Sequence, residues 1–175
     1  MEEFEACGLR YSVKYPEGFD ENEKYPVILF LHGAGTISND IKVLQGNQFF
    51  KYLEKLNIRA VAYAPQCNKG TVWYDNMERL EHFVKNVILK APFLDEKHVC
   101  LIGNSMGGYA SWQLAMSLNE TFSAVVPICG GGMYWYAYRL AKTPVWAFHG
   151  EDDHTVFCEE SRKMVNAVNK NGGNA

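Results

Sequence analysis

Short apolar runs recur along the sequence, and most of them end at a glycine, a proline or another turn-forming residue. Such runs are typical of strands that are buried on both faces of a parallel sheet. The runs occupy residues 27–31, 60–64, 99–102, 124–128 and 145–149. A looser alternation over residues 9–15 predicts an edge strand that ends at Pro16. Pro127 removes one backbone N–H from its run, so we expect a strand end or a sheet edge there.

Between these runs, apolar residues repeat at the spacing of one helical face. The pattern predicts helices over residues 48–56, 77–88, 106–117 and 159–169. Buried strands that alternate with helices of ordinary length indicate an α/β protein with right-handed crossovers. We therefore predict a doubly wound, mostly parallel sheet with helices on both faces. The sequence shows no repeat and no linker, so residues 1–175 are expected to form one domain.

Composition narrows the range of partners. Hydrophobic residues make up 47% of the 175 residues, and the formal net charge is −3, so the chain is globular and lacks the basic surface that nucleic acid requires. The first residues are acidic where a signal peptide would be basic, and no apolar stretch is long enough to span a membrane. The five cysteines lack metal-ligand spacing. We expect a reduced, cytoplasmic protein with no metal and no cofactor.

The strand at 99–102 runs directly into Gly103-x-Ser105-x-Gly107, the arrangement of a nucleophile elbow. In an elbow the serine sits on a sharp strand-to-helix turn with a strained backbone, and its neighbours at −2 and +2 come too close for side chains. The helix that follows directs N–H groups and a positive dipole end at developing negative charge. The alternative is a glycine-flanked helix start with an incidental serine.

An acyl-transfer site also needs donors for the oxyanion. The residue after an elbow serine normally supplies one N–H, which here is Met106. The second donor is expected from the glycine-rich loop at residues 32–35, which follows the strand at 27–31. Ligands of such sheets bind beyond the carboxyl ends of the strands, so we expect the two loops to converge. A glycine loop with a purely structural role is the alternative.

Together these segments resemble the α/β-hydrolase fold. More narrowly, they are similar to its dienelactone-hydrolase-like and phospholipase/carboxylesterase-like branch, which includes predicted peptidases and feruloyl-esterase-like enzymes. The resemblance covers almost the whole chain and is carried by residues 31–35, 95–99, 103–108, 112, 127–132 and 145–150. It implies that Ser105 attacks a carboxylic ester to form an acyl-enzyme, and that Ala34 and Met106 carry the oxyanion-binding N–H groups. Thioesterase and peptidase activities use the same steps and stay open.

The branch carries its catalytic acid in a His-Gly-x-x-Asp pattern after a strand. Here the pattern covers residues 149–153 and selects Asp153 as the residue that orients the base. Asp152 is the alternative, because one-residue boundaries are where sequence reasoning is weakest. Both aspartates could also be solvated loop charges.

The catalytic histidine is the main departure from the resemblance. In this fold the histidine follows the acid, on a loop after one further strand. The chain has histidines at positions 32, 82, 98, 149 and 154. Only His154 follows the acid, and adjacent side chains in a loop seldom face one another. We therefore expect the base to lie outside residues 1–175 and this chain alone to have little activity. A non-catalytic binding module that kept the fold is the alternative.

Two further expectations concern the same edge of the sheet. The strand at 145–149 would be an unprotected edge, open to pairing with a further strand or with another chain. Trp73 stands between the strand at 60–64 and the helix at 77–88, which places it at the carboxyl edge as a candidate substrate contact. Plain packing is the alternative for Trp73, as it is for Trp135 and Tyr136.

Overall fold

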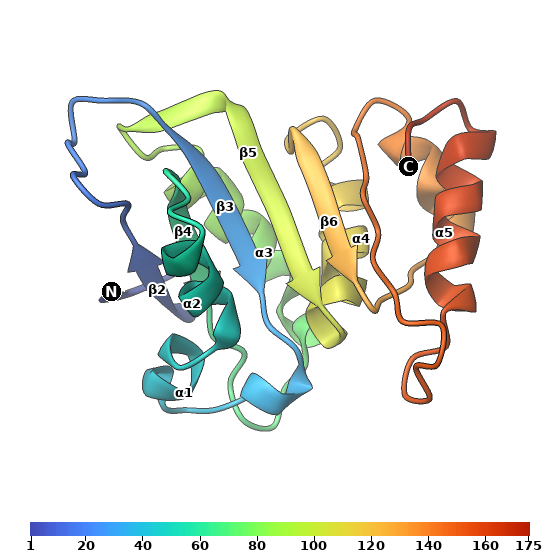
Figure 1. Cartoon of the computed structure of the whole chain (residues 1–175), viewed down its shortest axis with the longest axis horizontal. Coiled ribbons are helices and arrows are strands. Elements are labelled where there is room, and N and C mark those ends of the chain that lie inside the picture. Colours follow the sequence, from blue (N-terminus) through green and yellow to red (C-terminus); the bar gives the residue numbers. More distant parts are fainter.

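A six-stranded mixed sheet runs through the middle of the molecule (Figure 1). The computed structural model describes all of residues 1–175. The strands are β1 (Glu2–Ala6), β2 (Leu9–Lys14), β3 (Tyr25–Leu31), β4 (Val61–Pro65), β5 (Leu94–Asn104) and β6 (Ala124–Ile128). Their order across the sheet is β1-β2-β4-β3-β5-β6. Because β4, β3, β5 and β6 pair in parallel and only β1 and β2 are antiparallel, the predicted mostly parallel α/β fold is confirmed.

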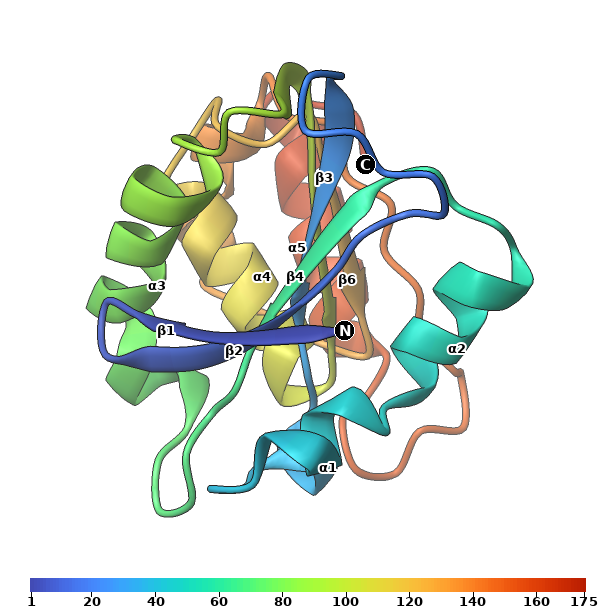
Figure 2. The same ribbon diagram turned by 90° about the vertical axis from the view of Figure 1, so that its left-hand side faces the viewer.

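Helices cover both faces of this sheet. The α-helices are α1 (Ile41–Gln45), α2 (Gln48–Lys55), α3 (Met77–Phe83), α4 (Met106–Ser117) and α5 (Glu159–Lys170). Seen along the sheet, α3 and α4 lie on one side and α1 and α2 on the other (Figure 2). α5 packs against the 3₁₀ segment η4 (Tyr134–Leu140), which also contacts α4. No helix combines the length and the apolar character needed to cross a membrane.

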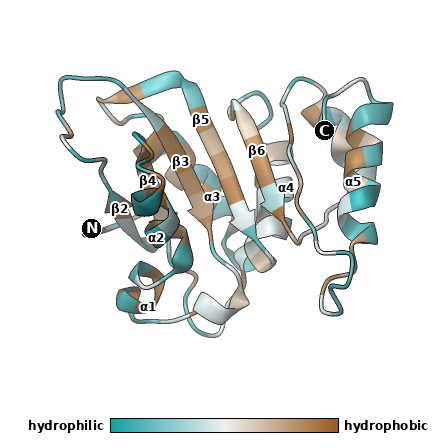
Figure 3. Ribbon diagram, viewed as in Figure 1, coloured by the Kyte–Doolittle hydropathy of each residue, from teal (hydrophilic) through white to brown (hydrophobic).

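The main hydrophobic core lies between the sheet and the helices α3, α4 and α5. It joins 32 buried residues, among them Leu29, Leu101, Trp112 and Met164. Figure 3 shows the hydrophobic residues concentrated along β3, β5 and β6. Burying one large aliphatic side chain contributes about 1.5–3 kcal/mol. The parallel strands therefore provide a stable frame, and the loops at their carboxyl ends are positioned by it.

The N-terminal hairpin differs from the prediction. Residues 9–15 were expected to form an edge, but β2 lies between β1 and β4, and β1 is the edge strand. Three of the five residues of β1 are glutamates and most of the strand is exposed, so its sequence lacks the apolar run that marks the central strands. Phe4 stacks on Tyr11 with ring centroids 5.5 Å apart, and this cross-strand contact helps to hold β1 in place.

The helix expected over residues 77–88 is divided. α3 gives way to a π-helical turn, η3 (Val84–Ile88), in which the Leu89 N–H donates to the Val84 carbonyl. The wider turn keeps Leu80, Val84 and Ile88 fully buried, so the predicted apolar face is confirmed although the regular helical geometry is not.

Residues 145–149 also depart from a regular strand. They run beside β6 and form two isolated parallel bridges, Val125 to Val145 and Ile128 to Phe148. Pro127 has no N–H, but its carbonyl accepts a hydrogen bond from Phe148 N–H at 3.0 Å. On the side away from β6, the Val145 N–H donates to the Asn174 carbonyl at 2.9 Å. The side chains of Trp146 and Phe148 are 70% and 43% exposed. With isolated bridges to β6 and one bond on its other side, the segment lacks the continuous ladder of a strand.

Candidate active site

Ser105 occupies the turn between β5 and α4 with φ 54° and ψ −116°. A residue with a side chain rarely adopts a positive φ, and it keeps one only where its surroundings enforce it. Here the Ser105 N–H donates to the Ile128 carbonyl at 2.7 Å, and the Ser105 carbonyl accepts from Tyr109 N–H at 3.1 Å. The strained conformation expected for the elbow serine is therefore confirmed.

The two glycines of the elbow are required by close backbone contacts. A Cβ on Gly103 would lie 2.0 Å from the Gly107 carbonyl oxygen, and a Cβ on Gly107 would lie 1.9 Å from the Leu31 carbonyl oxygen. Cβ atoms do not approach other heavy atoms that closely, so alanine cannot occupy either position without moving the backbone. The clash expected at the positions two before and two after Ser105 is confirmed.

The oxyanion loop, residues 32–36, lies against this turn. A Cβ on Gly33 would lie 3.2 Å from the Asn104 carbonyl oxygen and 3.4 Å from Ser105 Cβ. Ala34 is the first residue of the 3₁₀ turn η1 (Ala34–Thr36), and Met106 is the first residue of α4. A first helical residue has no acceptor for its N–H within its own helix. The two N–H groups predicted to bind the oxyanion thus come from neighbouring backbone segments and lack intrahelical partners; their role stays a prediction.

A buried histidine connects the oxyanion loop to the segment after β4 through hydrogen bonds. His32 is fully buried; its Nδ1–H donates to the Gly33 carbonyl at 2.8 Å, and its Nε2 accepts from Cys67 N–H at 2.9 Å. Burial lowers the pKa of His32, so the ring stays neutral at neutral pH, and Nε2 keeps the lone pair that the Cys67 N–H needs. His32 is therefore engaged in the loop and is not positioned as a base for Ser105.

Trp73 is not a substrate contact, and this prediction is wrong. Its side chain is fully buried, and its indole N–H donates to the His32 carbonyl at 2.8 Å. Because Trp73 follows β4, it does lie at the carboxyl edge of the sheet, as expected. Its ring, however, packs against the inner side of the oxyanion loop. It acts as a support for that loop, the packing role that sequence reasoning left as the alternative.

The candidate acid, Asp153, lies in what we call the acid loop, residues 149–158. Its Oδ1 accepts hydrogen bonds from Val156 N–H at 3.0 Å and Thr155 N–H at 2.9 Å. These two backbone bonds lower the pKa of Asp153, so its carboxylate is charged at neutral pH. The neighbouring Asp152 is exposed and makes no hydrogen bond through its side chain. This geometry favours Asp153 over Asp152 as the candidate acid.

No histidine of the chain forms a hydrogen bond with Ser105. His149 binds Ser161 Oγ through Nδ1 and the Val156 carbonyl through Nε2, both at 2.7 Å. His154 is exposed. His82 lies on α3, and His98 pairs with Asp95 near the amino end of β5.

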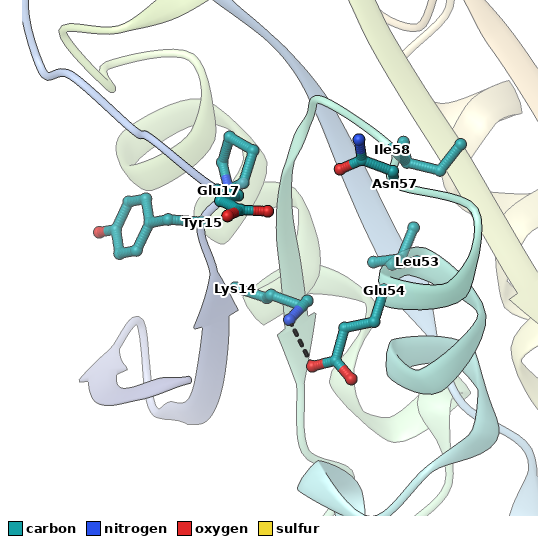
Figure 4. A pocket seen from close by; sticks show the side chains of 8 residues that line it. Lys14, Tyr15, Glu17, Leu53, Glu54, Asn57 and Ile58 are labelled. Atoms are coloured by element: carbon teal, nitrogen blue, oxygen red, sulfur yellow. Dashed lines mark hydrogen bonds and ion pairs between the residues drawn. The ribbon is translucent and has the colours of Figure 1, made fainter.

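Two of the surface cavities are lined in part by α2. One, of about 340 Å³, lies between β2 and α2 and is lined by charged and polar side chains, with Lys14 paired to Glu54 at 2.7 Å (Figure 4). Lys14 pairs with Ala62 near the start of β4, so this cavity is far from the carboxyl ends of the parallel strands. The other, of about 260 Å³, is next to the elbow. It is lined by Phe30, Asn47, Gln48, Phe49, Tyr52, Ile102, Asn104 and Ile128.

Comparison with protein families identifies the family of this fold. The dienelactone hydrolase family matches residues 62–175, which is more than half of the chain. The chain belongs to the dienelactone hydrolase family and has the α/β-hydrolase fold. The resemblance that the sequence motifs carry is thereby confirmed.

Curated relatives are larger proteins. The chain is similar to endo-1,4-beta-xylanase Y of Acetivibrio thermocellus, with 27% identity over 151 residues and 71% of this chain. It is also similar to dipeptidyl-peptidase 5 of Aspergillus fumigatus, with 24% identity over 217 residues and 91% of this chain. The chain spans only 13% and 28% of the length of these two relatives.

Solved structures give the same fold. A thermostable esterase matches 94% of this chain and 48% of its own, with a TM-score of 0.82 and 29% identity. A ferulic acid esterase matches 94% of this chain and 80% of its own, with a TM-score of 0.74. At 17% identity, this second likeness bears on the fold alone.

Proposed function

We propose that this chain carries the nucleophile, the oxyanion donors and the acid of a serine hydrolase that cleaves carboxylic esters through an acyl-enzyme. The strained backbone of Ser105, packed against the oxyanion loop, is the observation that carries the proposal. Strain of this kind costs about 1–3 kcal/mol and is concentrated at functional sites. A purely structural turn at this point would gain stability from glycine in place of Ser105.

Each residue has a defined role in the reaction. Ser105 Oγ attacks the ester carbonyl as its proton passes to a histidine base, and the N–H groups of Ala34 and Met106 bind the resulting oxyanion. The alcohol leaves with the proton from the base. Water then attacks the acyl-enzyme, gives one proton to the base, and releases the acid as Ser105 regains its proton. Asp153 orients the base and stabilises its positive charge.

In this proposal the base is a histidine from outside residues 1–175. The supporting observation is that none of the five histidines of the chain bonds to Ser105, and His32 and His149 are held by other groups. Without a base, an oxyanion site still accelerates hydrolysis by about 10³–10⁴-fold over water. Residues 1–175 alone are therefore expected to hydrolyse activated esters only slowly.

The apolar part of the ester would occupy the cavity next to the elbow. This cavity of about 260 Å³ has three aromatic rings among its lining side chains, and Asn104 and Ile128 connect it to the Ser105 turn. Aromatic and aliphatic walls favour an apolar or aromatic substrate group. We propose small esters with one such group as the substrate class.

The decisive experiment compares Ser105→Ala with its parent, both in the protein that includes the proposed histidine base, on short-chain aryl esters and on a fluorophosphonate probe. Loss of both ester hydrolysis and probe labelling is the expected result, because alanine has no nucleophile and the unactivated serines elsewhere react poorly with the probe. Ser117→Ala is the matched control, since Ser117 lies on the same helix and its hydroxyl accepts only a side-chain bond from Gln113. Equal hydrolysis by Ser105→Ala and the parent would refute the proposal.

A peptidase is the second candidate. It is favoured by the dipeptidyl-peptidase relatives, one of which matches 91% of this chain. Dipeptidyl anilides and matched aryl esters with the same acyl group separate the two activities. A higher rate on the anilide would identify the peptidase, and a thioester in the same series tests thioesterase activity. Failure of all three, with no probe labelling, would favour a binding module.

We further propose that the protein works in the reducing cytoplasm. All five cysteines are free, and Cys67 and Cys158 are buried, so no disulfide contributes to the fold. Reducing agents are accordingly expected to leave thermal stability unchanged, and cell fractionation tests the location itself.

A further inference from the structure

A thiol, an imidazole and a carboxylate meet beside the acid loop. They belong to Cys129, which follows β6, and to His149 and Asp153 at the start of the loop. One ligand-type atom from each lies within 4.8 Å of the others, and His149 Nε2 is 3.7 Å from Asp153 Oδ2. This is the one place in the chain where three side chains of this kind come together. The proposed hydrolysis assigns no role to Cys129.

We propose that Cys129, His149 and Asp153 form a binding site for a zinc-like divalent cation. Thiolate, imidazole and carboxylate are the three ligand types that zinc uses in proteins. Magnesium and calcium require oxygen ligands, so a thiolate disfavours both. All three residues are half-buried, which leaves the fourth tetrahedral position to water.

The observed separations are close to those of a filled site. Zinc bonds to sulfur, nitrogen and oxygen are about 2.0–2.3 Å, so tetrahedral ligand atoms stand roughly 3.3–3.8 Å apart. The Nε2 to Oδ2 distance of 3.7 Å is already in that range, and the remaining separations are at most 4.8 Å. Closure requires the ligand atoms to approach by about 1 Å and the His149 ring to exchange the Val156 carbonyl for the cation.

The backbone holds two of the ligands in place. Cys129 has φ 49°, and its N–H donates to the Phe148 carbonyl at 2.8 Å, so its position is tied to the segment that carries His149. Asp153 Oδ1 accepts the two backbone N–H groups of the acid loop, which leaves Oδ2 for a cation. The site is thus built from segments whose geometry does not depend on the ion.

The third ligand has the outer partner that metal-binding histidines need. Ser161 Oγ donates its proton to the Gly130 carbonyl at 2.8 Å, so it accepts a hydrogen bond from His149 Nδ1 at 2.7 Å. A bond of this kind is the outer partner that metal-binding histidines use. In this structure Nε2 is directed at the Val156 carbonyl at 2.7 Å, so cation binding requires the ring to turn Nε2 away from that carbonyl. On binding, the Cys129 thiol proton and the Nε2 proton pass to solvent. The half-buried Val156 carbonyl then exchanges its bond from Nε2 for one from water.

A bound cation would oppose the proposed catalysis, and this consequence rests on the proposed function. Oδ2 is the oxygen of Asp153 that remains available to orient the base. A cation bound to Oδ2 withdraws that oxygen and neutralises its charge, so metal binding and hydrolysis exclude one another. Zinc would therefore inhibit the esterase through its acid, without contacting Ser105.

The test is titration of the reduced chain with cobalt(II), which takes zinc sites and reports its ligands by absorption. We expect one cobalt per chain, a thiolate-to-cobalt charge-transfer band, visible bands typical of tetrahedral geometry, and displacement of cobalt by one equivalent of zinc. Cys129→Ala should abolish the charge-transfer band. His149→Gln and Asp153→Asn should each weaken binding at least tenfold.

Matched controls come from the same regions. Cys158→Ser removes a thiol that lies next to Glu159, and His154→Gln and Asp152→Asn remove potential ligands from the same loop. These three variants should bind cobalt as the parent does. A charge-transfer band that survives in Cys129→Ala, or that disappears in Cys158→Ser, would overturn the site.

A Cys129→Ala variant with a changed near-ultraviolet circular dichroism spectrum would be replaced by Cys129→Ser, with the same expected loss of the band. Because cobalt absorption does not depend on hydrolysis, failure of the metal site and failure of the proposed function are distinguishable. In the protein that includes the proposed base, ester hydrolysis inhibited by zinc in the parent but not in Cys129→Ser would support the antagonism with catalysis. Equal inhibition of both would refute it.

Discussion

The elbow and the acid loop both lie at the carboxyl edge of the sheet, but they are held in place by different interactions. At the elbow, backbone segments are in van der Waals contact, and Gly103 and Gly107 fill spaces too small for a Cβ. The acid loop is partly exposed and is held by hydrogen bonds to Asp153 and His149. At the elbow, almost any added atom would clash with the backbone. In the acid loop, a substituted side chain is tolerated if it still accepts the same hydrogen bonds. Substitutions in the two regions should therefore separate loss of folding from loss of chemistry.

The largest effect on folding is expected from Gly107→Ala. Its Cβ would overlap the Leu31 carbonyl, and overpacking of backbone costs about 3 kcal/mol or more, a large part of the total stability of a domain. Urea unfolding followed by circular dichroism measures the loss. Gly35→Ala is the control, because a Cβ on Gly35 meets nothing within 4 Å and should change stability by less than about 0.5 kcal/mol. Similar stabilities of the two variants would contradict the steric account of the elbow.

In the acid loop, Asp153→Asn should affect the rate and leave the fold intact. The asparagine oxygen can still accept the two backbone N–H groups, but it cannot balance the charge of the base. We expect a loss of about 10³–10⁴-fold in ester hydrolysis by the active protein and a melting temperature close to that of the parent. Asp152→Asn, one residue away, should retain its activity. Reversal of these two results would identify Asp152 as the acid.

A smaller effect should reveal strain at Ser105. Glycine adopts a positive φ without the steric cost that a side chain imposes. Ser105→Gly should therefore be about 1 kcal/mol more stable than Ser105→Ala in chemical unfolding, although neither variant hydrolyses esters. Equal stabilities would indicate that the turn carries no strain.

The smallest effect is a difference in pH response between the two regions. Burial lowers the pKa of His32, whereas the unfolded chain takes up a proton on this residue below about pH 6.5. Stability should therefore fall as the pH drops below about 6.5 and should stop falling from this cause below the folded-state pKa. The carboxylate of Asp153, whose pKa is lowered, contributes to stability above about pH 4 and loses its contribution only in stronger acid.

Unfolding in urea between pH 5 and pH 7 measures the His32 contribution. His32→Gln should flatten the slope of stability against pH in this window, whatever its effect on absolute stability. An unchanged slope would show that His32 takes up its proton equally well in both states.

Sequence reasoning succeeded where local chemistry determines geometry. The apolar runs predicted β3 to β6, and the glycines around Ser105 predicted a strained turn, because in both cases neighbours in sequence are also neighbours in space. It failed for β1, because a segment rich in glutamate does not have the composition of a strand. β1 forms because it pairs with β2. It also failed for Trp73, because position along the chain does not reveal which way a ring packs.

The cluster of Cys129, His149 and Asp153 was beyond sequence reasoning for a related reason. Its members are 4 to 24 residues apart, they come from two segments, and they match no metal-ligand spacing. Only the pairing of residues 145–149 with β6 brings the thiol to the acid loop. The proposed base could not be located from the sequence either. Ser105 and Asp153 indicate that a histidine is needed, but they do not indicate its position in the chain.

The four tryptophans give this protein a built-in optical readout. Trp73 and Trp112 are fully buried, whereas Trp135 and Trp146 are 60% and 70% exposed. An aqueous quencher such as iodide will reach the second pair and spare the first. Emission of the folded protein therefore divides into a quenchable fraction from Trp135 and Trp146 and a protected fraction from Trp73 and Trp112. Trp73 packs against the oxyanion loop, so loosening of that loop would move its emission from the protected fraction to the quenchable one. A molecule bound over residues 145–149 would instead protect Trp146 from the quencher.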